Sequence, residues 1–316
     1  MERILVEAAH LHLMSAPSDE ADALGTWAKS LRSSITGLPS PHPAKDALST
    51  PSPDRRASYV PLPPTPDRRY DMSHESRGVA LIINNKAFNE ELDLGYRAGS
   101  DVDAKTLADL FKTLKFKEEN IHSYDDLSTA HMLAAMRHFA EQNYDNMDCF
   151  VCAILTHGKE GVVFGKEGVI TLEALMEPFK NSRNQSLVGK PKIFLVQACR
   201  GSRFDGGVEA MESRMEADAP VKVALEADFL YAFSSSPGYF SWRNSARGSW
   251  FVQALGKVIK ENVERLHEID LLRILTRVNY EVAYGFESNV PGDALKHRKK
   301  QMPSVVSMLT KELYFA

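Results

Sequence analysis

The sequence has little cysteine, no long apolar run and no strong excess of one charge. It holds three cysteines in 316 residues, and so small and odd a number argues against a disulfide framework and favours a reducing compartment. No stretch approaches the roughly 18–20 apolar residues of a membrane span, and the charges among the first 14 residues do not suit a secretory signal. The net charge of −4 provides no polycation for nucleic acid or an acidic membrane surface. We therefore expect a cytoplasmic protein that binds neither nucleic acid nor membranes.

Two of the cysteines, Cys149 and Cys152, form a CxxC pair. A metal or redox site would need a second pair, which the chain lacks. Both residues lie in the apolar run 149–155, which is typical of a buried strand. We interpret them as packing residues, and we expect no metal and no organic cofactor.

Proline divides the chain, because nine of its 16 prolines lie between Pro39 and Pro66. This tract is also rich in Ser, Thr and charge, and it cannot bury enough apolar surface to offset the entropy of ordering it. The composition therefore predicts a disordered or extended leader before about residue 75, with at most a short helix near its start.

From residue 77 onward, apolar runs alternate with segments of helical periodicity. Ser100 and Asp103 resemble the cap and third residue of a helix. This alternation predicts an α/β fold with a mostly parallel sheet of about six strands and helices on both faces. The predicted strands are 78–83, near 121, 149–155, 193–198, 228–234 and 305–309, with a hairpin at 161–170; the predicted helices begin near 100 and 128, end near 178, and span 250–263 and 269–286. Residues 200–226 show little periodicity and form an interruption.

Two predicted strands end in reactive side chains, His157 and Cys199. Because ligands of open α/β sheets bind beyond the carboxyl ends of the strands, these two residues could be neighbours. A nearby imidazole activates a thiol as a nucleophile, and the backbone N–H groups of Gly158 and Cys199 could stabilise an oxyanion. Taken singly, such a cysteine is more often a buried small hydrophobe, and such a histidine is more often a structural loop residue.

The segment Gln197-Ala198-Cys199-Arg200-Gly201 resembles the pentapeptide of the caspase family, with His157 upstream. The resemblance extends over residues 77–316, through the segments 82–85, 99–103, 227–230, 237–245, 248–251 and 307–310. It implies a caspase-like three-layer sandwich and a cysteine endopeptidase that cleaves after aspartate. The acidic tetrapeptide Asp19-Glu20-Ala21-Asp22 and the short leader resemble the executioner type, which cleaves Asp-Glu-X-Asp-like motifs and executes apoptosis.

The resemblance also implies a substrate site. Arg97, Gln197 and Arg243 match the residues that bind the aspartate, where a guanidinium fork fits a carboxylate that has left water. The other matches are Tyr239 and Trp242 for the preceding residue, Ser241 and Arg243 for main-chain contacts to an extended peptide, and Asn244 and Trp250 for the fourth residue back. Singly, the arginines could form structural ion pairs, and the aromatic residues could be core. Because Tyr239 and Trp242 follow a Pro-Gly turn, we expect them on an exposed loop.

Two further features follow from the resemblance. The histidine should be oriented by a backbone carbonyl just before the first pocket arginine, and Gly95 in Leu94-Gly95-Tyr96-Arg97 is the candidate. No side chain is predicted as a third catalytic member.

Zymogen processing after aspartate is implied as well. Asp218, followed by Ala219, is the first candidate, Asp205 is the second, and Asp22 repeats the string Glu-Ala-Asp-Ala. Coincidence in acidic linkers is the alternative. The predicted organisation is a propeptide at 1–22, a Pro/Ser-rich disordered leader at 23–75, a large catalytic region at 76–218 whose linker begins near 202, and a small catalytic region at 219–316.

The expected partners are protein substrates with exposed Asp-containing loops, an upstream initiator caspase and inhibitor proteins. The zymogen is expected to form a homodimer and then an assembly of two large and two small subunits. Two rival hypotheses remain: a catalytically silent caspase-like regulator or binding protein, and a related peptidase with basic specificity, for which two pocket arginines carry the wrong charge.

Overall fold

The computed structural model describes residues 19–21, 68–181, 183–201 and 226–315. Its centre is a six-stranded sheet in the order β12-β9-β8-β4-β2-β3. Five strands are parallel and β12 runs antiparallel to β9, so the predicted mostly parallel sheet is confirmed. The strands are β2 (Ser76–Asn84), β3 (Ile121–Asp125), β4 (Met147–Leu155), β8 (Lys192–Gln197), β9 (Phe229–Phe233) and β12 (Ser304–Ser307).

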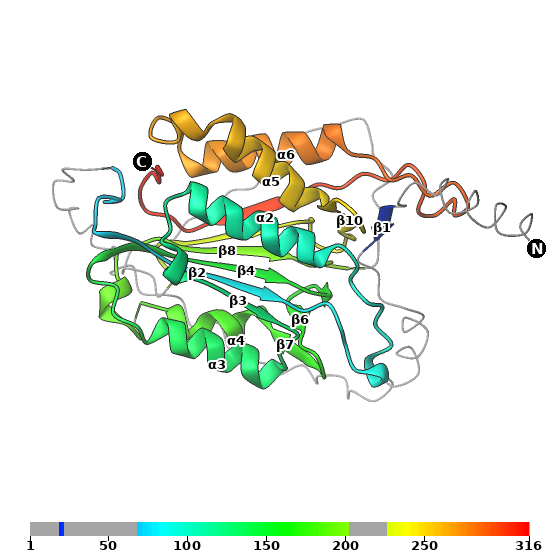
Figure 1. Cartoon of the computed structure of the whole chain (residues 1–316), viewed down its shortest axis with the longest axis horizontal. Coiled ribbons are helices and arrows are strands. Elements are labelled where there is room, and N and C mark those ends of the chain that lie inside the picture. Colours follow the sequence, from blue (N-terminus) through cyan, green and yellow to red (C-terminus); the bar gives the residue numbers. More distant parts are fainter. Residues whose placement is uncertain (1–18, 22–67, 182, 202–225, 316) are drawn as a thin grey trace, which may run out of the picture.

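Helices cover both faces of this sheet, which gives the three predicted layers (Figure 1). One face carries α2 (Ser100–Thr113), α5 (Trp250–Glu261) and α6 (Leu271–Gly285), and the other carries α3 (Thr129–Ala140) and α4 (Leu172–Met176). Alternate residues of β2 enter separate cores: Ala80 and Ile82 face one, and Leu81 and Ile83 face the other. Burial on both faces explains why this strand is continuously apolar.

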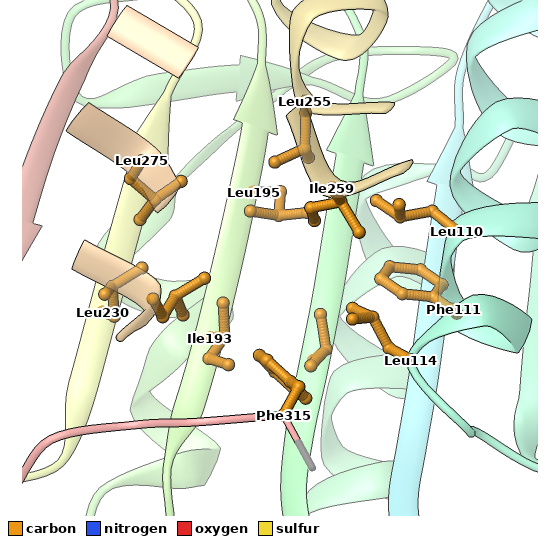
Figure 2. Close-up of a pocket in the computed structure, with 12 residues that line it drawn as sticks. Leu110, Phe111, Leu114, Ile193, Leu195, Leu230, Leu255, Ile259, Leu275 and Phe315 are labelled. Carbon is orange, nitrogen blue, oxygen red and sulfur yellow. The ribbon is translucent and has the colours of Figure 1, made fainter. Parts of the chain in front are cut away.

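The core under α2 and α5 contains a small cavity (Figure 2). Leu110 and Phe111 of α2, Leu255 and Ile259 of α5, and Phe315 near the C-terminus point into it. Its volume is about 30 Å³ and its lining is entirely apolar. A gap of this size with an apolar lining offers no polar side chain that could bind a ligand.

Two smaller sheets flank the main one. The first contains β5 (Gly158–Lys159), β6 (Val162–Phe164) and β7 (Val169–Thr171), and it confirms the predicted hairpin. The second joins β1 (Asp19–Ala21), β10 (Trp242–Asn244) and β11 (Gly248–Ser249). Short 3₁₀ helices complete the described chain at Glu90–Leu92, Glu118–Asn120, Glu177–Phe179, Gln185–Leu187 and Val263–Arg265.

Residues 68–75, at the end of the predicted disordered or extended leader, are described by the structure and contain no helix or regular strand. Tyr70 is 5% exposed, and its hydroxyl donates a hydrogen bond to Asp228 at 2.8 Å. Arg69 also forms a β-bridge with Glu312. The proline tract ends at Pro66, and the buried ring of Tyr70 lies just after it in the sequence. Most of the remaining leader lies outside the described residues.

The predicted N-terminal cap of α2 by Ser100 is wrong. Gly99 is the N-cap residue, with φ of 84°, and no side chain caps this end. Ser100 Oγ donates instead to Asn84 Oδ1, and Asp103 Oδ1 accepts the N–H of Ser249. Ser100 and Asp103 therefore bond to residues distant in the sequence and not to the N–H groups at the start of α2. By contrast, Ser128 caps α3 by accepting the N–H of His131.

Within the described ranges, no helix combines the length and the apolar character needed to cross a bilayer.

Candidate active site

The reactive residues follow adjacent central strands. Leu155, at the end of β4, pairs with Asn84 of β2 on one side and with Gln197 of β8 on the other. The contact continues beyond the strands, because the N–H of Thr156 donates to the carbonyl of Gln197 at 3.1 Å. The chain passes from β2 to its neighbour β3 and then returns to β4 on the other side of β2, so the strand order reverses beside β4. Open α/β sheets bind ligands at such a reversal.

Gly158 lies directly against Cys199. A Cβ atom on Gly158 would lie 2.8 Å from the carbonyl oxygen of Cys199 and 2.9 Å from the Cβ of Ala198. These distances leave no room for a side chain, so glycine is needed at this close approach. The two predicted oxyanion donors, Gly158 and Cys199, are therefore neighbours in space although they lie far apart in the sequence.

The ring of His157 is fixed from two sides. Its Nε2 atom lies 2.8 Å from the carbonyl oxygen of Gly95, the carbonyl suggested by the sequence. A carbonyl only accepts, so Nε2 carries the proton and Nδ1 presents a lone pair. Nδ1 is buried and has no hydrogen-bond partner among the described residues. Phe88 packs against the ring with centroids 5.0 Å apart, a contact that the sequence analysis missed.

The imidazole and the thiol are both neutral in this state. Burial, together with the charge of Arg97, lowers the pKa of His157 to about 4, against the opposing effect of the Gly95 carbonyl. Burial raises the pKa of Cys199 to about 12, although the Ser241 N–H and Arg97 act in the opposite direction. That N–H donates to Cys199 Sγ at 3.4 Å. Cys199 is 1% exposed and His157 is 2% exposed, so both reactive side chains are buried in this structure.

Arg97 is completely buried beside this pair. Its Nη1 donates to the carbonyl of Asn85 at 3.1 Å and to Ser100 Oγ at 2.7 Å. Burial lowers the pKa of Arg97 to about 10, while electrostatic interactions with Asp103 and Cys199 act to raise it. The guanidinium therefore remains a cation at neutral pH.

The other two predicted pocket residues are held near Arg97. Arg243 Nε donates to the carbonyl of Ala98 at 2.6 Å, and Gln197 Nε2 donates to Ser241 Oγ at 2.7 Å. Backbone contact supports the arrangement, because a Cβ atom on Gly99 would lie 2.6 Å from the carbonyl oxygen of Asn244. Arg97 follows β2, Gln197 ends β8 and Arg243 lies in β10, and these contacts join the three segments.

The two predicted tryptophans form one stack. The rings of Trp242 and Trp250 are 5.6 Å apart at 16°, and Phe286 continues the stack beyond Trp250. Both tryptophans are buried, so the prediction of an exposed loop is wrong for Trp242, which begins strand β10. Tyr239, in the turn before Trp242, is partly exposed.

Asn244 and Asp103 anchor the end of this region. Asn244 Oδ1 accepts the N–H groups of Ala246 and Arg247, each at 3.0 Å. The sequence analysis assigned no site role to Asp103, a buried carboxylate whose pKa burial raises to about 7, against the Ser249 N–H and the charge of Arg97. Its spacing after Ser100 predicted a helix N-terminal cap. In the structure its partner is instead the N–H of Ser249, the residue before Trp250.

The three predicted processing sites, Asp22, Asp205 and Asp218, lie outside the described residues.

Comparison with known proteins gives consistent matches. A family model described as Caspase domain matches residues 77–314. Caspase-3 of Bos taurus is 43% identical over 249 residues, which cover 79% of this chain and 88% of that protein. Caspase-7 of Gallus gallus is 44% identical over 257 residues, covering 79% of this chain and 81% of that protein. The crystal structure of caspase-1 from Spodoptera frugiperda aligns with a TM-score of 0.72 and 38% identity, over 83% of this chain and 98% of that one.

Proposed function

The chain belongs to the caspase family, and from that premise we propose that Cys199 is its nucleophile and His157 its proton-transfer residue. Membership makes it a cysteine-type endopeptidase of the executioner type, which cleaves after aspartate in apoptosis and is made as a zymogen. The observation that carries our assignment is the close approach of Gly158 to Cys199, because it joins the nucleophile, the neighbour of the imidazole and two backbone donors in one place.

The proposed reaction is acyl transfer. Cys199 Sγ bonds to the carbonyl carbon of the cleaved residue, and the N–H groups of Gly158 and Cys199 hold the oxyanion. The thiol proton reaches the departing amine through His157, the C–N bond breaks, and a thioester remains. Water then adds to the thioester and releases the new carboxylate, while its proton returns the thiol to its starting state. Nδ1 of His157 is suited to this relay because its lone pair is otherwise unused.

Aspartate specificity follows from the charge of the proposed pocket. Arg97, Gln197 and Arg243 supply two guanidinium groups and an amide for one carboxylate. A buried carboxylate must regain its lost hydrogen bonds, and a planar fork can provide two of them at once. Two cations at this position oppose a basic side chain, which disfavours the peptidase of basic specificity.

We assign the neighbouring residues to the rest of an acidic tetrapeptide. Tyr239 and Trp242 would pack the residue before the aspartate, and Asn244 and Trp250 would hold the fourth residue back. Ser241 and Arg243 would contact the peptide main chain, which would add to strand β10 as a further strand.

The family acts on protein substrates and assembles through dimers. For this chain we propose a homodimer of zymogens that matures into two large and two small subunits, with an initiator caspase upstream and inhibitor proteins as regulators. We also propose a cytoplasmic location, which the three free, buried cysteines support.

The experiment is a panel of peptides that differ only at the cleaved residue, with Cys199→Ala as the control. We expect turnover only after aspartate, none by the control, and loss of aspartyl activity in a folded Arg243→Glu variant. Activity of that variant on aspartyl peptides would remove the pocket assignment. Failure of an aspartyl-ketone probe to label Cys199 would favour the alternative of a catalytically silent regulator.

A further inference from the structure

Two exposed tyrosines lie side by side on the outer face of α6. Tyr280 is 63% exposed and Tyr284 is 74% exposed, and the centroids of their rings are 4.8 Å apart. The packing of α6 on the core uses the opposite face of the helix, which buries Ile274, Val278 and Val282. Single exposed apolar residues are normal on a protein surface, whereas adjacent exposed aromatic rings are typical of a binding surface.

Two arginines extend this pair into a stripe. Arg273, Arg277, Tyr280 and Tyr284 follow one another at spacings of four, three and four residues, and all of them are exposed. Such spacings place the side chains along one side of a helix. The helix rises about 16 Å over these positions, a length that about five residues of extended peptide would cover. We name these residues the α6 stripe.

The α6 stripe carries positive charge that the fold does not compensate. Neither of its arginines forms an ion pair with any residue in the described ranges, and Arg277 donates to the neutral side-chain oxygen of Asn262. The two carboxylates in the groove between α5 and α6, Glu261 and Glu281, both pair with Lys257. A guanidinium binds a carboxylate with two hydrogen bonds, so the stripe is complementary to an acidic segment.

The α6 stripe adjoins the proposed substrate site. Tyr284 comes just before the end of α6, and Phe286 follows at once. The ring of Phe286 stacks on Trp250, with centroids 5.4 Å apart. Since we assign Trp250 and Asn244 to the fourth residue back, the part of a substrate that precedes this residue leaves the site beside Phe286. It therefore emerges at the end of α6 where the stripe begins.

We propose that the α6 stripe binds an acidic segment of protein substrates, located just before the cleaved tetrapeptide. The arginines bind the carboxylates of that segment, and the tyrosine rings pack against its apolar side chains. This inference rests on the proposed function, and it adds a second determinant of which proteins are cleaved. A tetrapeptide offers few contacts, so binding energy from outside it can separate proteins that share the same cleaved motif.

The test compares two synthetic peptides that share one Asp-Glu-X-Asp site and the residues after it. In the acidic peptide, about ten preceding residues consist of Glu and Leu; in the neutral peptide, Gln replaces each of these Glu residues. We expect wild type to cleave the acidic peptide with a kcat/KM about tenfold higher. The difference should lie in KM, because the stripe binds the substrate and the transition state equally. High salt should reduce it, because exposed charges are screened.

Charge variants locate the source of this preference. The double variant Arg273→Glu and Arg277→Glu should cleave the two peptides equally well. The control is the double variant Arg137→Glu and Arg183→Glu, which makes the same change of net charge at exposed positions beside α3 and α4. It should keep the preference of wild type. Equal loss in both double variants would show that overall charge, and not the stripe, selects the acidic peptide.

The aromatic pair is tested in the same way. Tyr280→Ala with Tyr284→Ala should raise KM for the acidic peptide, while Tyr124→Ala, at another partly exposed tyrosine, should not. A bare Asp-Glu-X-Asp reporter ends before the stripe, so every variant should cleave it as wild type does. Equal kcat/KM of wild type for the acidic and neutral peptides would overturn this inference alone. Absence of reporter turnover by wild type would overturn the proposed function, and this inference with it.

Discussion

A β-carbon on Gly158 would lie 2.8 Å from the carbonyl oxygen of Cys199. The two residues follow different strands, β4 and β8, so this approach is set by the sheet and not by local sequence. The clashing atom is a backbone oxygen, so the clash cannot be relieved by a change of side-chain rotamer. A methyl group at Gly158 must therefore displace the loop that carries the nucleophile.

We predict that Gly158→Ala lowers kcat by on the order of 10²–10³, the effect of losing one oxyanion donor. KM should change little, because the pocket side chains are not altered. The matched control is Gly168→Ala, where the nearest atom, Thr129 Cγ2, lies 3.9 Å away. Steady-state kinetics and thermal melting of both variants measure the result. Equal kcat values in the two variants would show that the close approach has no part in catalysis.

The second prediction concerns the buried cation. Arg97→Lys keeps the charge but loses the planar guanidinium, which donates to Asn85 and Ser100 and which we propose to bind the substrate carboxylate. A charge-assisted hydrogen bond contributes about 1.5–3 kcal/mol, so kcat/KM on aspartyl peptides should fall roughly 10- to 100-fold. The exposed Arg137→Lys on α3 serves as the control. An unchanged kcat/KM for Arg97→Lys would mean that this side chain does not bind the substrate.

The strands, the helices and the reactive pair could be predicted because their signals are local. An apolar run such as 78–83 indicates a buried strand wherever it lies, and Cys199 and His157 each follow such a run. Their shared edge then follows from parallel topology. Even the carbonyl of Gly95 could be suggested, since its position is fixed relative to Arg97.

What the sequence did not predict depends on contacts between distant segments. Asp103 lies at a capping position, yet its partner is Ser249, 146 residues away. Trp242 follows a turn, yet it is buried because Trp250 stacks on it. The pairing of β1 with β10 has no local periodicity to reveal it, because an added strand is recognised by the backbone and not by a pattern of side chains.

The third prediction concerns the linker. Asp218→Ala should leave the chain uncut at the first candidate site, so that intact-mass spectrometry finds no fragment that begins at Ala219. Peptidase activity should fall if the cut matures the site. Asp205→Ala is the comparison, and we expect it to leave the Ala219 terminus intact. Full activity of wild-type protein with an intact linker would contradict this assignment.

The fourth prediction concerns the edge of the main sheet. Strand β12 pairs on one side with β9, and its Val306 is 47% exposed. An exposed apolar edge strand is a template for pairing with another chain. Val306→Asp should shift the homodimer toward monomer in sedimentation velocity. Val169→Asp, 55% exposed on β7, should not, and a monomeric wild type would refute the proposed dimer.

The fifth prediction concerns the pH dependence of stability. Burial raises the pKa of Asp103 from its ordinary 3.8 to about 7, so the folded state binds this proton more tightly than the unfolded state does. The contribution of Asp103 to the free energy of unfolding is then fully present below about pH 4 and is lost as the pH rises to about 7. Asp103→Asn keeps an oxygen to accept the Ser249 N–H but cannot ionise. Its melting temperature should therefore rise relative to wild type between pH 4 and 8, by an amount that corresponds to on the order of 1–4 kcal/mol.

A second aspartate on the same helix provides the opposite case. Asp109 is exposed, and its carboxylate accepts a hydrogen bond from Lys105 Nζ. This hydrogen bond lowers the pKa of Asp109. Its contribution is present above its ordinary pKa and is lost as the pH falls below it. Asp109→Asn should therefore leave the difference from wild type flat between pH 5 and 8, where Asp103→Asn changes most. If the two variants show the same pH profile, the carboxyl of Asp103 is not held neutral by burial, and its hydrogen bond to Ser249 alone accounts for its place in the fold.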